Sequence, residues 1–541
     1  MDTLLVRLDE TVTGFFGQWN LWTSIIASAF TGILVYYVFT QQDPDTHPFL
    51  LARQAEGAPV RQPGESPVYR SRSAPLNMPL NSGLNVKEPG ANKWSRGRDG
   101  DLRDIWRQAI AGVQQEEPAK GGVGARGRIL TLRGADKAIE HSLDDITRQI
   151  NLIGQSLNEK GAARVAIYLP NSVELIATLF ACAFYNMTAV ILPFDQPDEA
   201  VVSMVRRSGA DTVVTATGSF PFDAVVKSYP ALRQLIWVVD EGSRHMDWNE
   251  VPQGTGSSVT VNTWQDIISE SPVDAGKELP ALERQPPPLD VTIFWQAKKG
   301  QQEDIVCFTS ANLIAGIAAQ LAAIPTAQRI SNTDLFLPAD SLANTHTLLL
   351  TLAALFSNAS VAFNSVAAQA DDLAVATRGV SPTIITATPA ALLKTYQEDS
   401  ARVNASPVSR LLHSFRARKL TDSGIFPAPS KLAGNKLRLI LTAERAGTGT
   451  PLLSAAVLND LRVFTGARIV YALTAAKVAG AVTQTGFFDY RVPQDVAGGG
   501  SFFGPPTTST EILFKDTEKW KTGDHGSRGE VSFHASGCLG K

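Results

Sequence analysis

The sequence predicts an α/β protein in which helix-covered parallel sheets follow one apolar N-terminal helix. Three observations carry this prediction. Strand-like and helix-like segments alternate from residue 164 onward, which is typical of parallel sheets. Residues 21–40 contain no Asp, Glu, Lys, Arg or His. Between the two parts, residues 41–100 are rich in proline, which interrupts helices and sheet ladders alike, so we expect a linker there.

Residues 21–40 are the one segment that we expect to cross a bilayer. A helix of this length spans roughly 30 Å, the thickness of the hydrocarbon layer. Aromatic side chains that favour the membrane interface lie near both ends: Trp19, Trp22, Tyr36 and Tyr37. A cleaved signal peptide is the alternative, but it begins with a basic segment, whereas residues 1–10 carry Arg7 against three acidic residues. A buried core helix is a further alternative, weakened by the proline-rich segment that follows. We therefore expect a short N-terminal segment, 1–20, and then a retained anchor.

The compartment is predicted only in outline. Three cysteines, Cys182, Cys307 and Cys538, give no sign of a disulfide framework, which favours the cytosolic side for the large domain. We expect the endoplasmic reticulum membrane, with the mitochondrial outer membrane and the lipid droplet as alternatives. The net charge of −3 gives no reason to propose a nucleic acid partner.

The end of the predicted linker is basic. Lysine and arginine side chains recur there: Lys87, Lys93, Arg96, Arg98, Arg103 and Arg107. A contact with a membrane surface is one interpretation. A solvated linker is the simpler one, because acidic residues such as Glu88 and Asp104 interrupt the run.

From residue 101 to 541 the composition is that of one large globular domain. The first alternating block has expected strands at 164–169, 188–192, 211–215 and 234–239, and expected helices at 173–185, 198–208 and 222–229. Residues 241–288 are polar and proline-rich, so we expect a surface excursion or a subdomain boundary there. The second block has expected strands at 291–295, 304–309, 383–386, 437–441, 467–471, 511–514 and 529–533, and expected helices at 312–324, 389–396 and 451–464.

Four stretches resemble motifs of the adenylate-forming (AMP-binding) enzymes, most of all those of long-chain acyl-CoA synthetases. They are Tyr168-Leu-Pro-Asn-Ser-Val-Glu174; Ser310-Ala-Asn-Leu-Ile-Ala-Gly-Ile-Ala318, which is similar to the family's T-H-x-N-L; Tyr471-Ala-Leu-Thr474, which is similar to Y-G-x-T-E; and Gly504-Pro-Pro506 followed by Glu511 and Gly529-Glu-Val531. The resemblance extends from about residue 130 to 541. It implies the fold of that family's large domain.

The resemblance also implies a chemistry. Members of this family join ATP and a carboxylic acid into an acyl-adenylate and then transfer the acyl group to coenzyme A. They use a Gly/Ser/Thr loop ending in Lys for the phosphates, a Glu for Mg²⁺, and a Lys on a small C-terminal domain. The chain ends at Lys541, so we expect that small domain to be missing.

The phosphate loop of the family falls on residues 296–301 of this chain, and only Gly300 is retained. The loop's Lys falls on or near Asp304, whose charge repels phosphate. Lys298 and Lys299 are the candidates for replacing that charge, although two lysines beside a glycine also suit an ordinary exposed turn.

The third motif keeps Tyr471 and Thr474, and the resemblance implies that they contact nucleotide. The position of the metal-binding Glu is Ala475, which has no oxygen ligand. Glu444 is a nearby carboxylate, for which a salt bridge is a simpler role than metal binding. We therefore predict no metal site and no catalytic residue, and a nucleotide site of Lys298, Lys299, Gly300, Tyr471 and Thr474 that is degenerate.

Two functions from different classes follow. The preferred hypothesis is a membrane-anchored pseudoenzyme of the acyl-CoA synthetase type, which needs no cofactor and serves as a scaffold for a protein partner or holds a fatty acyl group. The apolar stretch 348–356 is a candidate lining for an acyl tunnel, although a plain core helix explains it more simply. The alternative is an active long-chain fatty acid-CoA ligase that uses ATP, Mg²⁺ and coenzyme A.

Overall fold

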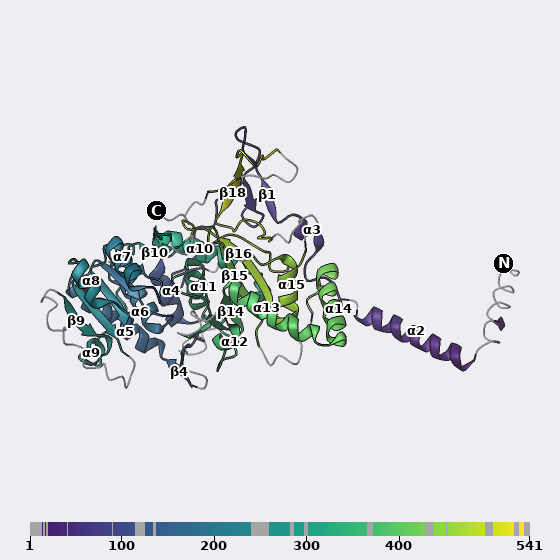
Figure 1. Ribbon diagram of the computed structural model, residues 1–541, viewed down its shortest axis with the longest axis horizontal. Coiled ribbons are helices and arrows are strands. Elements are labelled where there is room, and N and C mark those ends of the chain that lie inside the picture. The colour runs from purple at the N-terminus through teal and green to yellow at the C-terminus, as the bar shows by residue number, and fades with distance from the viewer. Residues whose placement is uncertain are drawn as a thin grey trace.

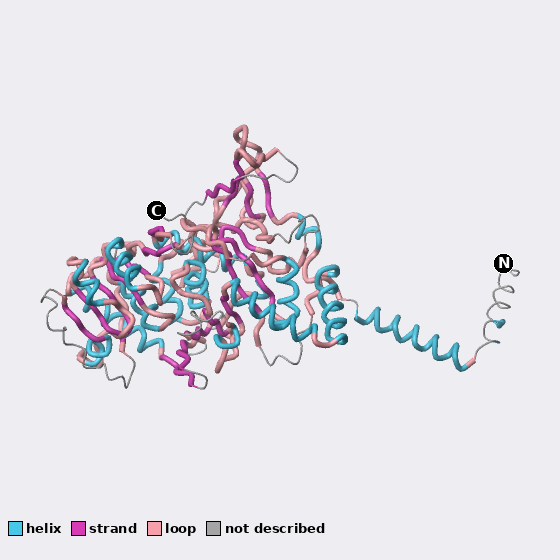
Figure 2. Tube along the Cα trace, in the orientation of Figure 1, coloured by secondary structure: helices cyan, strands magenta, loops and turns pink. Residues whose placement is uncertain are grey.

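The computed structural model describes most of the chain and arranges it around three sheets (Figures 1 and 2). The described residues are 20–40, 42–88, 90–92, 94–113, 125–133, 137–239, 259–281, 286–296, 301–364, 372–427, 436–450, 452–492, 501–523 and 530–534, with Thr13, Gly14 and Gly17.

A seven-stranded sheet combines the four strands of the first alternating block with one strand from the polar segment after it and the first two strands of the second block. Its strands are β5 (Arg164–Tyr168), β6 (Thr188–Ile191), β7 (Thr212–Ala216), β8 (Gln234–Val238), β9 (Thr260–Thr263), β10 (Val291–Trp295) and β11 (Asp304–Phe308). Their order is β11-β10-β6-β5-β7-β8-β9, and β11 alone is antiparallel to its neighbour. The central strands β5 and β6 are short, largely apolar and buried on both faces, as expected for a parallel sheet between helices.

An eight-stranded sheet is formed mainly by the second block. Its strands are β3 (Ile129–Arg133), β4 (Lys137–His141), β12 (Leu335–Pro338), β13 (Ser360–Phe363), β14 (Ile384–Ala387), β15 (Leu439–Arg445), β16 (Arg468–Thr474) and β17 (Ala481–Gln484). Their order is β17-β16-β15-β14-β12-β13-β3-β4, with antiparallel strands only at the two edges. The predicted α/β class with parallel, helix-covered sheets is thus confirmed.

Some of the helices lie between the two large sheets. The described helices are α2 (Leu21–Thr40), α3 (Pro48–Ala52), α4 (Leu102–Ala111), α5 (Leu143–Glu159), α6 (Val173–Phe184), α7 (Asp198–Ser208), α8 (Phe222–Ser228), α9 (Trp264–Ser269), α10 (Ser310–Ala323), α11 (Thr345–Phe356), α12 (Leu373–Ala376), α13 (Pro389–Asn404), α14 (Pro407–Ser423) and α15 (Ala455–Thr465). One hydrophobic cluster joins α4, α6, α10 and α11 to strands of both sheets. The two sheets therefore share a continuous core.

Helix α10 begins two residues earlier than predicted. The Thr309 hydroxyl accepts a hydrogen bond from the Asn312 N–H (3.1 Å), and the Asn312 side chain accepts one from the Thr309 N–H (2.8 Å). This reciprocal arrangement satisfies two N–H groups that the first turn of a helix leaves free. In the motif that starts at Ser310, the asparagine therefore has a structural role as part of a helix cap.

The prediction that residues 41–100 are a linker is wrong for the described residues. Strands β1 (Ala55–Gly57) and β2 (Tyr69–Ser71) form a four-stranded sheet with β18 (Glu511–Lys515) and β19 (Glu530–His534), in the order β1-β2-β18-β19. Val68 and Leu80 are buried, and Arg70 forms an ion pair with Glu511 at 2.8 Å. The prolines lie outside these very short strands, so they limit the length of the strands without preventing pairing.

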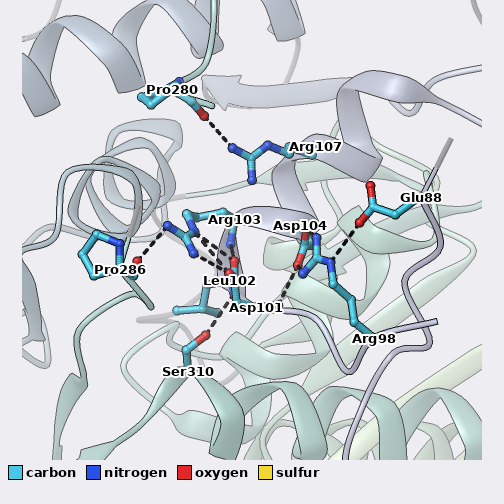
Figure 3. Close-up of polar contacts among 10 residues, drawn as sticks. All are labelled: Glu88, Arg98, Asp101, Leu102, Arg103, Asp104, Arg107, Pro280, Pro286 and Ser310. Carbon is cyan, nitrogen blue, oxygen red and sulfur yellow. Dashed lines mark hydrogen bonds and ion pairs between the residues drawn. The ribbon is translucent and has the colours of Figure 1, made fainter. Parts of the chain in front are cut away.

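The basic end of the same segment is also part of the folded body (Figure 3). Arg98 forms an ion pair with Asp104, and Arg103 with Asp101 at 2.6 Å. Arg107 donates to the carbonyl of Pro280 at 2.6 Å. These arginines form intramolecular contacts at and near the start of α4. Neither of the two interpretations, a solvated linker or a contact with a membrane surface, therefore applies to them.

Part of the predicted surface excursion belongs to the seven-stranded sheet. Strand β9 pairs in parallel with β8, and α9 packs against α5. The polar composition of residues 241–288 concealed a strand because β9 is at the edge of the sheet, where only part of its surface is covered. Residues 240–258 and 282–285 lie outside the described part of the chain.

Helix α2 occupies the range predicted for the apolar helix and leaves the body as a separate arm (Figure 1). Its apolar side chains are exposed, among them Trp22 (71%), Ile26 (66%), Phe30 (67%) and Ile33 (66%). No helix within the described residues is both long and apolar enough to cross a membrane. The predicted helix is present, while its membrane role stays a prediction.

Candidate functional site

The candidate site lies where the parallel strands of the eight-stranded sheet end. The carboxyl ends of β15 and β16 are adjacent, since Glu444 is paired in register with Leu473 and Arg445 with Thr474. In open parallel sheets this edge is where ligand sites form. Polar side chains collect here on strands that are otherwise apolar.

Glu444 and Tyr471 form the centre of the site. The Tyr471 hydroxyl donates to Glu444 Oε2 at 3.2 Å, and the Thr450 hydroxyl donates to Glu444 Oε1. Burial raises the pKa of Glu444, although both donors stabilise its charged form. Burial, and then the neighbouring carboxylate, raise the pKa of Tyr471, so its hydroxyl stays protonated and remains a donor. The contacts described for Glu444 are thus hydrogen bonds in place of the salt bridge that we expected.

The Tyr471 ring is enclosed as well. Its exposed fraction is 0%, and its ring centroid lies 4.8 Å from that of Phe503. The Tyr471 hydroxyl also accepts a long hydrogen bond from the Leu453 N–H at 3.4 Å. Contacts on the ring and at the hydroxyl therefore already occupy the side chain in this structure.

Arg445 connects this edge to the other large sheet. Its guanidinium group lies 4.5 Å from the ring centroid of Trp295, the last residue of β10. Burial lowers the pKa of Arg445, and the carboxylates of Asp340 and Glu444 oppose that shift. Within the described residues, Arg445 Nε has no hydrogen-bond partner.

Asp340 completes the polar group. It follows β12 and accepts hydrogen bonds from the Ser341 N–H, the Asn344 amide and the Thr347 hydroxyl, each at 2.7 Å. Burial raises the pKa of Asp340. Because all three donors come from the turn and first residues of α11, this carboxylate organises the start of that helix.

Asn171, in the first predicted motif, joins the two sheets. Its amide nitrogen donates to the carbonyls of Pro338 (3.1 Å) and Asp340 (2.8 Å), and its oxygen accepts from the Leu342 N–H (2.9 Å). The motif after β5 therefore has a clear structural role, which fixes the turn after β12 next to the turn after β5.

Of the predicted nucleotide residues, the structure brings Tyr471 and Thr474 to this edge. Thr474 donates to the Glu444 carbonyl at 2.9 Å. Lys298, Lys299 and Gly300 lie outside the described residues. The flanking positions are described: Trp295 and Asp304 pair directly, so the altered loop connects two antiparallel strands, and Asp304 is exposed.

Sequence reasoning missed Asp340, Arg445 and Thr450. Each of them lies at the end of a buried strand or follows one. Polar residues at such positions of a parallel sheet are the signal by which the sequence could have identified them. Ala475, where the resemblance places the family's metal-binding Glu, packs beside Val478, Val482 and Ile512. Within the described ranges no group of three or more His, Cys, Asp or Glu side chains is arranged to hold a metal ion.

The proposed acyl-tunnel stretch is part of the core. Its side chains from Leu348 to Leu355 are buried in α11, and Leu348, Leu349 and Leu352 have exposed fractions of 0%. The simpler interpretation, a core helix, describes these residues.

Comparisons with known proteins agree with this fold. Residues 130–290 match the family model of AMP-binding enzymes. No curated protein matches the sequence significantly. The structure is similar to the anthranilate CoA ligase AuaEII in complex with anthranoyl-AMP, with a TM-score of 0.56 and 15% identity over 81% of this chain and 70% of that one.

Two further structures are similar over comparable lengths. The N-terminal domain of FACL13 from Mycobacterium tuberculosis has a TM-score of 0.54 and 15% identity, covering 82% of this chain and 90% of that one. ATP-bound MatB from Rhodopseudomonas palustris has a TM-score of 0.54 and 14% identity, covering 82% and 71%. The resemblance to adenylate-forming enzymes is therefore confirmed, and the chain has the fold of their large domain and is consistent with a member of the AMP-binding superfamily.

Proposed function

We propose that this chain is a membrane-associated, acyl-CoA synthetase-like protein that is impaired in adenylation and acts as a pseudoenzyme, as a scaffold or lipid-binding protein. The enclosed side chain of Tyr471 carries the proposal. The resemblance implies that this position contacts nucleotide, yet the ring packs against Phe503 and the hydroxyl is bound to Glu444. A nucleotide must displace these contacts before it can stack on the ring.

The metal requirement supports the same proposal. Adenylate-forming enzymes use ATP and Mg²⁺, and Mg²⁺ takes oxygen ligands at about 2.1 Å. At the position of the family's metal-binding Glu, Ala475 packs among apolar side chains. The carboxylate of Glu444 already accepts two hydrogen bonds. The described residues therefore do not fit a Mg²⁺–ATP complex held in the manner of the family.

Calorimetry with Mg²⁺–ATP on the full chain in detergent, together with fatty-acid-dependent release of pyrophosphate, tests this proposal. We expect neither binding nor turnover, while an active acyl-CoA ligase in the same assay gives both. Turnover that disappears when Lys298 and Lys299 are replaced by alanine would overturn the proposal. That result would assign the chain to the alternative, a long-chain fatty acid-CoA ligase with a rebuilt phosphate loop.

Membrane association is proposed from α2. Its large apolar side chains have exposed fractions of about one half or more. Leaving this apolar surface in water is unfavourable in free energy compared with burying it. We infer that a lipid environment covers them, with the large domain on the cytosolic side of the endoplasmic reticulum. Co-flotation of the full chain with vesicles tests this inference. An Ile26→Glu, Ile33→Glu variant is expected to lose flotation. A wild-type chain that stays in the dense fraction would contradict the inferred membrane association.

A further inference from the structure

Helix α14 presents an apolar stripe to solvent. Val408, Leu411, Leu412 and Phe415 have exposed fractions of 66%, 72%, 53% and 69%. They follow each other at the spacing i, i+3, i+4 and i+7, which places them on one face of the helix. Four large apolar side chains exposed together are unusual on a soluble surface and mark a site that another apolar body covers.

The opposite face of α14 is fixed to the body. His413 contacts Asp460 at 2.9 Å and stacks on Phe464 with ring centroids 4.6 Å apart. Leu420 is fully buried, and the Thr421 hydroxyl accepts from Asn459 at 3.2 Å. These contacts set the rotation of the helix about its axis, so the stripe points outward because of the fold.

Basic side chains accompany the stripe. Within α14 four basic residues, Arg410, Arg416, Arg418 and Lys419, stand against one acidic residue, Asp422. At 100° per residue, Arg416 and Arg418 lie on the two flanks of the stripe, and both are exposed. An apolar face bordered by long cationic side chains is typical of helices that lie in the interface of an anionic bilayer.

The position of α14 agrees with such a role. Lys419 Nζ lies 3.4 Å from Gln42 Oε1, and the Asp45 N–H donates to the Gly424 carbonyl at 2.9 Å. The residues just after α2 are thus held against the end of α14. In Figure 1 α2 leaves the body beside α14, and its axis points away from the body, crosswise to the axis of α14. A membrane that takes up α2 would therefore lie close to α14.

We propose that α14 is an interfacial helix that lies flat on an anionic membrane, with its apolar stripe at the boundary between headgroups and acyl chains and its arginines toward the headgroups. This inference rests on the proposed membrane association of α2 and adds a second, peripheral contact. The charge of the surrounding side chains is what selects an anionic lipid surface over an apolar partner surface.

Photo-crosslinking of the full chain tests the occupant directly. Leu412 is replaced by the photoreactive residue p-benzoylphenylalanine, and the chain is bound to vesicles of phosphatidylcholine with phosphatidylserine. We expect adducts with lipid, several-fold fewer of them in vesicles of phosphatidylcholine alone, and fewer again in an Arg416→Ala, Arg418→Ala variant. The same probe at Glu199, which is exposed on α7, is the matched control and is expected to give no lipid adduct.

Other outcomes overturn the proposal in distinguishable ways. If the chain floats with the vesicles and the adduct at position 412 joins α2, a second copy or another protein, that partner covers the stripe and the lipid assignment is wrong. Flotation with no adduct at position 412 also overturns it and leaves the role of α2 intact. A chain that does not float removes both the interfacial helix and the membrane association on which it rests.

Discussion

The two large sheets share one core but differ in the polarity of the side chains that they bear. The family match, 130–290, contains β5 to β9 of the seven-stranded sheet, whose interior is apolar. The eight-stranded sheet bears the candidate site, and there Glu444, Tyr471 and Asp340 satisfy one another or the adjacent turns. The difference teaches that apolar packing dominates inside the seven-stranded sheet, while the polar side chains at the site edge of the eight-stranded sheet are satisfied by hydrogen bonds within the chain.

The largest expected effect is in the shared core. Phe180 in α6 has an exposed fraction of 0% and packs on Trp106 with ring centroids 5.3 Å apart. Phe180→Ala removes these contacts and leaves a cavity, so we expect a loss of about 3–5 kcal/mol of stability. The midpoint of urea denaturation measures it. Glu199→Ala, an exposed change in the same half, is the control, and equal midpoints for the two variants would contradict the role given to the core.

A smaller effect is expected at the site edge. Tyr471→Phe leaves the buried carboxylate of Glu444 with one donor fewer, so we expect a loss of about 1.5–3 kcal/mol. A double-mutant cycle with Glu444→Gln should show coupling between the two side chains. If instead ATP raises the melting temperature of the wild type more than that of Tyr471→Phe, the hydroxyl serves a nucleotide and the comparison between the sheets fails.

Two carboxylates near opposite ends of the central strands of the eight-stranded sheet are expected to respond to pH with opposite sign. Burial would raise the pKa of Asp334, but hydrogen bonds from Arg438 and Thr383 outweigh burial and lower it. Burial raises the pKa of Glu444. A lowered carboxyl pKa adds stability above the unfolded value, about 3.9 for Asp, and this stability is lost as the pH falls through the folded pKa.

For Glu444 the sign reverses. The folded state holds the proton more tightly, so its contribution is greatest below the unfolded value of about 4.3 and falls as the pH rises through the raised pKa. We expect the advantage of the wild type over Asp334→Asn to shrink in acid, and that over Glu444→Gln to shrink toward neutral pH. The midpoints of urea denaturation of the wild type and the two variants, measured from acid to neutral pH, test both expectations. If the stability difference from the wild type changes with pH in the same direction for both variants, the opposite signs are refuted.

The alternating strands and helices could be predicted because each is a short apolar run bounded by a turn or a cap. Helix α7 was predicted at its observed residues, and β5, β8, β10 and β11 within one residue. The boundaries of α10 shifted because its cap includes Thr309, a side-chain contact that periodicity does not report.

The errors have a different cause. Residues 42–88 are held by partners about 440 residues away, such as Glu511 for Arg70, and composition reports only local preference. At the site, the position of Tyr471 was predictable from its motif. Its enclosure was not, because that depends on Phe503 and Glu444, which no local pattern places beside it.

The smallest expected effect concerns the loop that leads into β11. Asp304→Lys returns a cation to the position where the resemblance places the family's loop lysine. Asp304 is exposed, so we expect stability to change by less than about 0.5 kcal/mol. Calorimetry should still detect no binding of Mg²⁺–ATP, because one charge replaces neither the loop hydroxyls nor the metal-binding Glu that the resemblance implies for an active enzyme. Gln301→Lys places a lysine at another exposed position of the loop. Binding gained by Asp304→Lys and not by Gln301→Lys would show that a cation at position 304 is enough to restore ATP binding, and it would contradict the proposed loss of nucleotide binding.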